Sequence, residues 1–528
     1  MKRMRRLVLL TLVCAMLTSM CIGCGQTPSS SEETTDQTET TEATQTSSKT
    51  ASIALSENVL TLDPHQANNM SSYQVRQMVF DTLIETDHLG NYTPCLATDW
   101  SVSEDGLTIS LTLREGVKFH NGEDFNSADV VCTFQRLIDD PTLVVASTYW
   151  PLLTKVTAID DYHVELTLSE PWAGVPISLI NTFILPDEAF TELGDKLFTD
   201  QLLYGTGPWK FDEWVDGQHF HVVKNVDYWN KENFDSYYDD VYVRIVLEPS
   251  TAVAGHVAGD IQAYIASGGI STDVLPLYEG SEDRIDLVDI MTGGTHYIGF
   301  QCGEGSVFHD INVRKAVAYA IDRQSIVDYI LGAGAVPRSF MVEDRLGASD
   351  AIEEFPYNPE LAKEYLAKSD YNGEEITFSS NTGTLKSQEI VVAVAEMLNQ
   401  VGFNCKSEVV ESATLLEMRT TGNYDFFMVS TMQECNDPIK YINVYVKNDI
   451  HSHNYVDDEL WAKIDESNKT LDPEKRKALL EEIVADWSKT VVHFPIAQLE
   501  SVYAVDKDVD GIKLFDDGFF DFKYVTKK

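Results

Sequence analysis

Strand patterns alternate with helix patterns along most of this chain, and that alternation limits the folds open to it. In residues 107–113 apolar and polar side chains alternate at every position, which is typical of a half-buried strand. Residues 163–168 show the same pattern. Residues 310–320 instead place apolar side chains on one face of a helix that Asp310 can cap. Interleaved strands and helices predict an α/β architecture with more than one sheet.

The same reasoning predicts most of the other elements. Strands are expected at 209–223, 241–247 and 502–505, and an apolar helix at 390–398 that ends near Gly402. Further helices are expected to start with Ser127 as the N-cap, at Asn358–Pro359 and at Asp472–Pro473.

Size and charge restrict the class of protein. The chain has 528 residues, enough for two or three domains, and its 43% hydrophobic content suffices for large cores. The formal net charge of -45 argues against a nucleic-acid partner, because phosphate contacts require clustered Lys and Arg.

The first residues have the pattern of a targeting segment. Four basic residues precede an apolar run from Leu7 to Met20, which is too short to span a bilayer comfortably and fits a signal peptide over residues 1–23. Gly23 and Cys24 follow, and this pair resembles the bacterial lipobox, in which the cysteine receives a lipid. Ordinary signal cleavage that leaves a free Cys24 is the alternative.

A polar tract favours the lipid anchor. Residues 26–49 are rich in Ser, Thr, Glu and Gln and almost lack apolar residues, so they cannot bury enough surface to fold. We therefore predict that residues 24–50 comprise a lipidated cysteine and a disordered tether, which would hold the protein on the outer face of the bacterial cell membrane.

The five remaining cysteines show no CxxC or zinc-ligand spacing, so we expect neither disulfides nor a metal site and interpret them as buried small residues: Cys95, Cys132, Cys302, Cys405 and Cys435. His219 and His221 would share one face of a strand and offer a metal alternative, although a solvated strand face is far commoner.

An enzyme is the rival from another class. The motifs H-E-x-x-H and G-x-S-x-G are absent, and no S-x-x-K lies on a suitable element. Gly205–Thr206–Gly207 is not a phosphate loop, because Pro208 removes a backbone donor. We therefore expect no catalytic residues and no cofactor.

Several stretches together resemble one family, the bacterial extracellular solute-binding proteins of family 5, which capture peptides or nickel for ABC importers. The most specific stretch runs from Ser103 to Gly122 and continues through Ala128–Asp129–Val130. The others are Leu62–Asp63–Pro64–His65, Gly205–Thr206–Gly207–Pro208–Trp209, Val313–Arg314–Lys315–Ala316 and Ala320–Ile321–Asp322–Arg323.

The resemblance implies a periplasmic-binding-protein type II-like fold, with two lobes, a hinge and an extra inserted domain. Lobe I would comprise residues 51–90, 206–291 and 494–528, the inserted domain residues 91–205, and lobe II residues 292–493. Ligand would lie in the cleft between the lobes, and hinge closure would bury it.

The resemblance also implies site residues. Peptide-binding relatives hold the ligand's α-ammonium with an acidic residue, and Glu434, with Asn436 beside it, falls on that element here. An incidental surface loop is the equal alternative. Thr431 stands where the family usually has Trp, and Met428 where one relative has a basic residue.

His296 and Tyr297 match the strand that runs along the cleft in relatives, and one of the two should point into a core. For a ligand carboxylate the candidates are Arg338, Arg345, Lys386 and Arg419.

The predicted function is therefore that of a monomeric binding protein without catalytic activity, which delivers peptides to the transmembrane permease of an ABC importer. Nickel, haem or another small solute is the alternative ligand, and a peptide receptor without a transport role is the alternative function.

Overall fold

A computed structural model describes residues 49–66, 69–87, 91–341, 345–432, 437–447, 454–514 and 520–528. The chain divides into two units, residues 1–47 and residues 48–528, and every described element belongs to the second. The predicted signal peptide, Cys24 and nearly all of the predicted tether lie outside the described residues.

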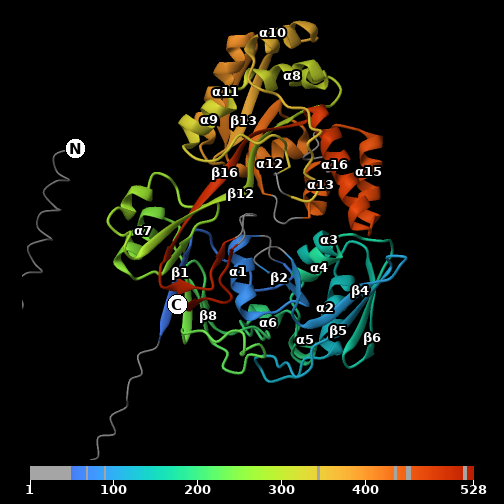
Figure 1. Cartoon of the computed structure of the whole chain (residues 1–528), viewed down its shortest axis with the longest axis vertical. Helices are drawn as coiled ribbons and strands as arrows, with labels where there is room; N and C mark the ends of the chain where they lie inside the picture. Colours follow the sequence, from blue (N-terminus) through green and yellow to red (C-terminus); the bar gives the residue numbers. More distant parts are fainter. Residues whose placement is uncertain are drawn as a thin grey trace, which may run out of the picture. The chain divides into compact units, whose positions relative to one another are not determined.

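A ten-stranded sheet forms the frame of residues 48–528. Two long strands, β12 (Ile285–Phe300) and β16 (His493–Asp506), lie side by side in the middle of it (Figure 1). Beyond β12 follow β15 (Phe426–Met432), β13 (Glu375–Asn381) and β14 (Asn404–Val410). Beyond β16 follow β11 (Ala263–Ile265), β1 (Thr50–Leu55), β10 (Asp240–Ile245), β9 (His219–Lys224) and β8 (Trp209–Val215).

A separate antiparallel sheet of four strands lies within residues 91–205. Its order is β4 (Ala97–Val102), β5 (Thr108–Leu113), β7 (His163–Leu168) and β6 (Leu153–Asp160), and helix α2 (Ser127–Asp139) packs against β6 and β7. The N-cap of α2 is Asn126, one residue before the predicted Ser127, because the Asn126 side chain accepts from the amide of Ala128. Asp129 accepts from the amide of Asn126 and completes a capping box.

The predicted helix starts in the second half of the chain are confirmed. Asp310, Asn358 and Asp472 cap α8 (Ile311–Ala320), α10 (Pro359–Lys368) and α16 (Pro473–Thr490) through their side chains. The other helices there are α9 (Arg323–Ile326), α11 (Ser387–Val401), α12 (Ser412–Thr421), α13 (Ile439–Tyr445) and α15 (Asp458–Lys469).

Short elements complete the described residues. The helices are α1 (Met70–Val79), α3 (Val144–Tyr149), α4 (Val175–Ile180), α5 (Asp187–Leu193), α6 (Lys196–Thr199) and α7 (Pro249–Ala258), with single turns η1 (Leu275–Tyr278), η2 (Val307–His309) and η3 (Val327–Leu331). The strands are β2 (Ile84–Thr86), β3 (Tyr92–Pro94), β17 (Val509–Asp510), β18 (Lys513–Leu514), β19 (Phe520–Asp521) and β20 (Thr526–Lys527).

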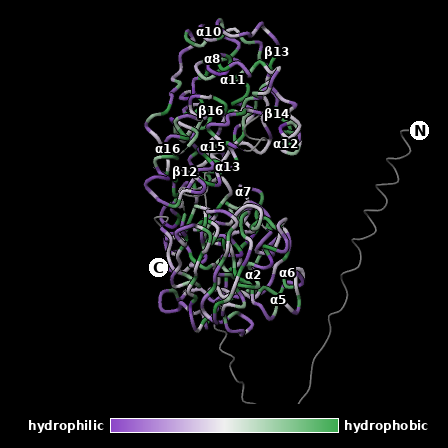
Figure 2. Tube along the Cα trace, turned by 90° about the vertical axis from the view of Figure 1, so that its right-hand side faces the viewer, coloured by the Kyte–Doolittle hydropathy of each residue, from purple (hydrophilic) through white to green (hydrophobic). Residues whose placement is uncertain are grey.

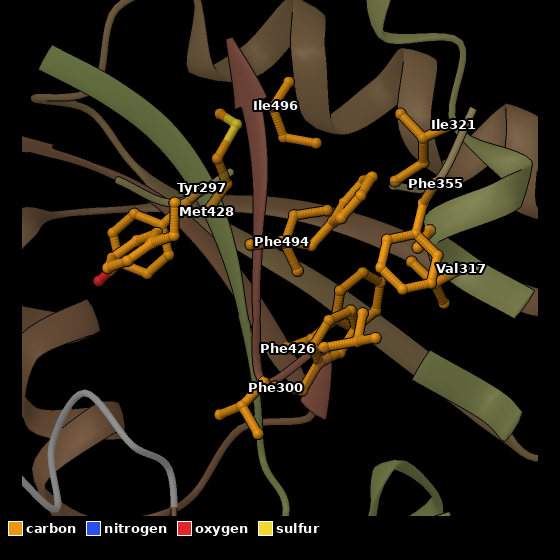
Figure 3. Packing of buried hydrophobic residues seen from close by; sticks show 14 of the residues in the cluster. Tyr297, Phe300, Val317, Ile321, Phe355, Phe426, Met428, Phe494 and Ile496 are labelled. Atoms are coloured by element: carbon orange, nitrogen blue, oxygen red, sulfur yellow. The ribbon is translucent and has the colours of Figure 1, made fainter. Parts of the chain in front are cut away.

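Buried side chains form three large cores that follow the two sheets. The largest core is formed by residues from Tyr297 to Ala497 in the sequence. Figure 3 shows its centre, where Phe300, Phe426 and Phe494 come together from three neighbouring strands. A second core surrounds β1 and includes the end of the chain, and a third fills the four-stranded sheet. Hydrophobic and hydrophilic stretches alternate along the trace (Figure 2), as elements with one buried face require. The domain boundaries stay predictions.

Cys95, Cys302 and Cys405 are buried and free as predicted, whereas Cys132 is only partly buried, and Cys435 lies outside the described residues. No helix in the described part of the chain is long and apolar enough to cross a membrane.

A buried ion pair joins the end of the chain to the segment after α1. Lys523 Nζ lies 2.6 Å from the carboxylate of Asp81, and the two side chains are 7% and 0% exposed. Thr206 and Trp229 each donate to the other Asp81 oxygen at 2.9 Å. Burial would lower the pKa of Lys523, but the combined attraction of Asp81 and the other acidic groups around it outweighs burial and raises that pKa well above its usual value.

A second buried polar group is His65. Its Nε2–H donates to the carbonyl of Phe183 at 3.0 Å, and its Nδ1 accepts from Arg136 at 2.9 Å. Only the neutral ring satisfies both bonds, because a protonated Nδ1 would face the guanidinium. Burial and the charge of Arg136 lower the pKa of His65 to about 4.

The buried pair yields a stability prediction. Asp81→Asn removes one charge and leaves Lys523 buried without it, so we expect the free energy of unfolding to fall by about 3–5 kcal/mol in urea denaturation. Asp124→Asn is the control, because its partner Lys118 and Asp124 itself are mostly exposed, and its effect should be much smaller. Equal effects of the two substitutions would contradict the assigned role of Asp81.

His65 yields a pH prediction. Its pKa is about 6.5 in an unfolded chain and about 4 in the fold, so the unfolded state binds the proton first as the pH falls. Stability from this residue is therefore present above pH 6.5 and is lost, by about 1.4 kcal/mol per pH unit, as the pH falls towards 4.

An NMR titration checks that prediction. The His65 ring signals, identified by their absence from His65→Gln, should keep the shifts of a neutral ring down to about pH 5. A midpoint near 6.5 would show that the ring is not held in its neutral form.

Candidate functional site

The pair β12–β16 carries an irregularity at its middle. The register is regular from Ile285 to Met291, shifts between Met291 and Thr295, and shifts again between His296 and Tyr297. Side chains fix this bulge: Thr292 Oγ1 donates to the carbonyl of Leu499 at 2.9 Å, and Gln498 Nε2 donates to that of Thr292 at 2.8 Å. A bulge bends its strand and increases its twist, so the two halves of β12 follow different directions.

Past the bulge, β12 is hydrogen-bonded on both edges. Residues 294–300 pair with β15 on one side, and from Thr295 onwards the strand pairs with β16 on the other. All nine residues from Thr292 to Phe300 are buried. His296 and Tyr297 lie in this inner half.

His296 is fully buried, and both of its ring nitrogens are engaged. Nε2 lies 3.1 Å from the carbonyl of Leu385 and must donate to it, so Nδ1 accepts from the hydroxyl of Ser430 at 2.9 Å. Burial lowers the pKa of His296 to about 4, which keeps the ring neutral. In this structure the ring links β12, β15 and the turn before α11.

Tyr297 points to the opposite side, into the largest core (Figure 3). Its ring centroid lies 5.0 Å from those of Phe340 and His493, both at steep angles. The hydroxyl is buried and has no hydrogen-bond partner among the described residues, and burial raises the pKa of Tyr297 above its ordinary value. Ligand contact by His296 or Tyr297 stays a prediction.

Arg419 lies in the last turn of α12 and is half-buried. Its guanidinium carbon is 4.5 Å from the ring centroid of Phe427, a cation–π contact that holds it against β15. Arg338 is bound by Asp350 and Glu354, and Lys386 lies 3.9 Å from Asp273. The assignment of a carboxylate-binding residue stays a prediction.

One edge of β15 changes its environment along the strand. Residues Phe426, Phe427 and Met428 pair with β13, but no strand among the described residues pairs with Val429–Met432 on that side. Ser430 is exposed there. An unpaired strand edge presents backbone donors and acceptors to any extended chain that reaches it.

Glu434 and Asn436 follow this edge in sequence and lie outside the described residues, as does Cys24. The residue just after them is fixed: both oxygens of Asp437 accept from Arg476, one at 2.7 Å, and these side chains are 15% and 7% exposed. This bidentate pair anchors the turn from which α13 begins.

The histidine pair of β9 does not form a metal cluster in the structure. His219 lies 3.0 Å from Glu213, whereas His221 lies 2.9 Å from Asp212. No group of three or more His, Cys, Asp or Glu side chains arranged to hold a metal ion occurs in the part of the chain that the structure describes.

A cavity of about 630 Å³ lies between residues 147–178 and residues 439–469. On one side its wall includes Tyr149, Trp172 and Ile177, and on the other Ile439, Lys440 and Asn443. Ligand pockets in proteins typically have volumes of about 300–1,000 Å³. The sequence motifs did not indicate this cavity, because its walls are nearly 300 residues apart in the chain.

Three contacts join the walls of the cavity. The amide of Ala173 donates to the carbonyl of Asn468 at 2.7 Å, and Lys469 lies 2.5 Å from Glu170. Lys440 Nζ donates to the hydroxyl of Tyr149 at 3.3 Å. Because each contact links residues 91–205 to residues 292–493, the cavity has its present walls only while these two segments touch.

Comparison with known proteins gives one consistent family. Residues 91–453 match the family model of bacterial extracellular solute-binding proteins, family 5 Middle. The glutathione-binding protein GsiB of Escherichia coli O6:K15:H31 is 28% identical over 367 residues, 69% of this chain and 70% of the relative. The oligopeptide-binding protein AppA of Bacillus subtilis is 28% identical over 382 residues, 67% and 68% of the two chains.

A solved structure agrees in fold. The ABC transporter substrate-binding protein CtaP of Listeria monocytogenes superposes with a TM-score of 0.80 at 20% identity, over 90% of this chain and 99% of CtaP. The α/β fold is therefore that of a periplasmic binding protein. This chain belongs to the bacterial extracellular solute-binding proteins of family 5, the non-catalytic substrate-binding components of ABC importers.

Proposed function

We propose that this solute-binding protein captures peptides in the cleft between its two predicted lobes and that a lipid on Cys24 holds it at the cell membrane. The observation that carries the peptide assignment is the unpaired edge of β15 at Val429–Met432. An extended peptide is the ligand that such an edge accepts, because its backbone supplies the matching donors and acceptors. Relatives named for oligopeptide and glutathione binding support the same class of ligand.

The position of the edge in the sequence agrees with an acidic anchor. Glu434 follows Met432 by two residues, so a peptide added to β15 would bring one end close to that carboxylate. A carboxylate enclosed by cleft closure requires a cation, and the α-ammonium of a peptide supplies it. Asp437, held by Arg476, would fix the turn behind Glu434.

Capture would couple ligand binding to closure. The contacts between residues 91–205 and residues 292–493 belong to one conformation, in which the two segments touch. A ligand that binds this closed arrangement more tightly than an open one increases its population. We expect the hinge to bend at the bulge of β12, which the side chains of Thr292 and Gln498 hold in place.

A thermal-shift screen tests the ligand class on residues 48–528, which form one compact unit. Di-, tri- and oligopeptides, glutathione, nickel complexes and sugars are tested in parallel. A ligand at 100 times its Kd should stabilise the fold by about 2.7 kcal/mol. We expect peptides to raise the melting temperature, and stabilisation by nickel complexes or sugars alone would contradict the peptide assignment.

The anchor is tested by Glu434→Gln. Loss of the charge should weaken binding of a peptide with a free amino group at least about ten-fold in calorimetry, since a charged hydrogen bond is worth roughly 1.5–3 kcal/mol. The same peptide with an acetylated amino group should bind equally to both forms. Glu417→Gln on the exposed face of α12 is the matched control, and an equal loss in that variant would refute the anchor.

The lipid anchor is tested in the full chain by cell fractionation. Cys24→Ala should move the protein from the membrane fraction to the soluble fraction, because the chain would lose its acylated residue. Cys21→Ala is the matched control and should leave the protein in the membrane fraction. Release by Cys21→Ala, with Cys24→Ala still bound, would reassign the lipidated residue.

A further inference from the structure

We propose that the cavity between residues 147–178 and residues 439–469 receives an apolar side chain of the peptide, so that the segment 91–205 takes part in choosing the ligand. This inference rests on the proposed peptide capture and goes beyond it, because it assigns a recognition role to a segment outside both predicted lobes. We call this space the side cavity.

Helix α13 separates the side cavity from the largest core. Tyr441 is 4% and Ile442 1% exposed, and both pack into that core. Ile439, Lys440, Asn443 and Val444 line the cavity instead. Positions i, i+1, i+4 and i+5 share one side of a helix. One face of this seven-residue helix therefore packs against the largest core, and the other face lines the side cavity. The helix starts directly after the turn fixed by Asp437 and Arg476.

The opposite wall is mainly apolar. Trp172 packs its indole edge against Gly174, where a Cβ atom would lie 2.6 Å from the ring, so a larger residue at this position would displace the indole. Ile177 on α4 is 4% exposed, and Pro151, Leu152 and Pro171 complete the surface. Binding is favourable when an apolar group displaces water from aromatic and aliphatic walls of this kind.

Most polar groups in the wall already have partners within the protein. Asn443 and Asn468 exchange amide hydrogen bonds at 3.0 and 2.9 Å, and Ser147 donates to the carbonyl of Leu143 at 3.0 Å. The acidic residues are neutralised as well, Glu170 by Lys469 and Asp465 by Lys447. An apolar occupant therefore leaves these groups satisfied, whereas a charged occupant would gain no counter-ion from the two paired acids.

The size of the cavity fits this occupant. At about 630 Å³ it exceeds any single side chain, so large residues such as leucine, phenylalanine or tryptophan enter without overpacking. The walls meet through the contacts of Glu170, Ala173 and Tyr149 with the facing segment. An occupant that touches both walls therefore stabilises the closed arrangement.

The test compares tri-alanine with tri-alanine peptides in which one residue is replaced by Leu, Phe or Trp, at each position in turn. The protein is residues 48–528, and Kd is measured by calorimetry. At one position of the peptide, we expect the large apolar residue to tighten binding at least about ten-fold, since burying such a side chain contributes on that scale.

Val444→Trp fills the side cavity from α13 and should abolish this gain while changing the Kd of tri-alanine less than about two-fold. Val392→Trp is the matched control, because Val392 is a half-exposed valine on α11, remote from the cavity lining, and this variant should keep the gain. Leu152→Trp fills the cavity from the other wall and provides a second variant if the first does not fold.

The outcomes separate the two proposals. Tri-alanine and its derivatives could bind while both filling variants keep the tighter binding of the apolar derivatives, or weaken all peptides equally. The side cavity then does not contact the ligand side chain, and peptide capture stands. If no peptide binds the unsubstituted protein, peptide capture fails and the role of the side cavity falls with it.

Discussion

The antiparallel pairing of β12 with β16 is the constraint on which the rest of the structure depends. Both strands are long enough to belong to two regions, so one continuous sheet carries β15, β13 and β14 at one end and β11, β1, β10, β9 and β8 at the other. Any change of angle between these regions must be absorbed within the pair. The bulge at Thr292–Gly294 is one of two places where the register of this pair is interrupted, and its side-chain bonds keep that interruption at a fixed position.

Local sequence signals predicted much of the fold because they depend on neighbouring residues. Strand β7 agrees with its alternation from His163 to Leu168, and Asp310, Asn358 and Asp472 cap the helices they were expected to cap. The predicted strand at 502–505 is only the outer part of β16, because both faces of its inner half are buried and periodicity is lost there. The N-cap of α2 is Asn126 and not the predicted Ser127, because the side chains of both residue types can accept a hydrogen bond from a backbone amide, and the sequence does not distinguish them.

The site was less accessible to prediction, because it depends on contacts between distant parts of the chain. Resemblance pointed to the strand that carries His296 and Tyr297, but the two side chains occupy opposite sides, one bonded to Leu385 and Ser430 and the other enclosed by aromatic rings. No sequence pattern indicates Tyr149 and Trp172 as ligand residues, because they face Lys440 and Asn443 only after folding. No pattern within a short window of sequence brings such residues together.

Residues 520–525 complete a core that also contains residues 51–62. Trp209 donates to the carbonyl of Lys523, Ser236 donates to that of Val525, and Lys523 neutralises Asp81. The core around β1 therefore lacks part of its wall and its buried cation until residues 520–525 pack against residues that lie several hundred positions earlier in the chain. Contacts at such long sequence separation cost loop-closure entropy before they contribute free energy, so this core closes slowly compared with cores built from local contacts.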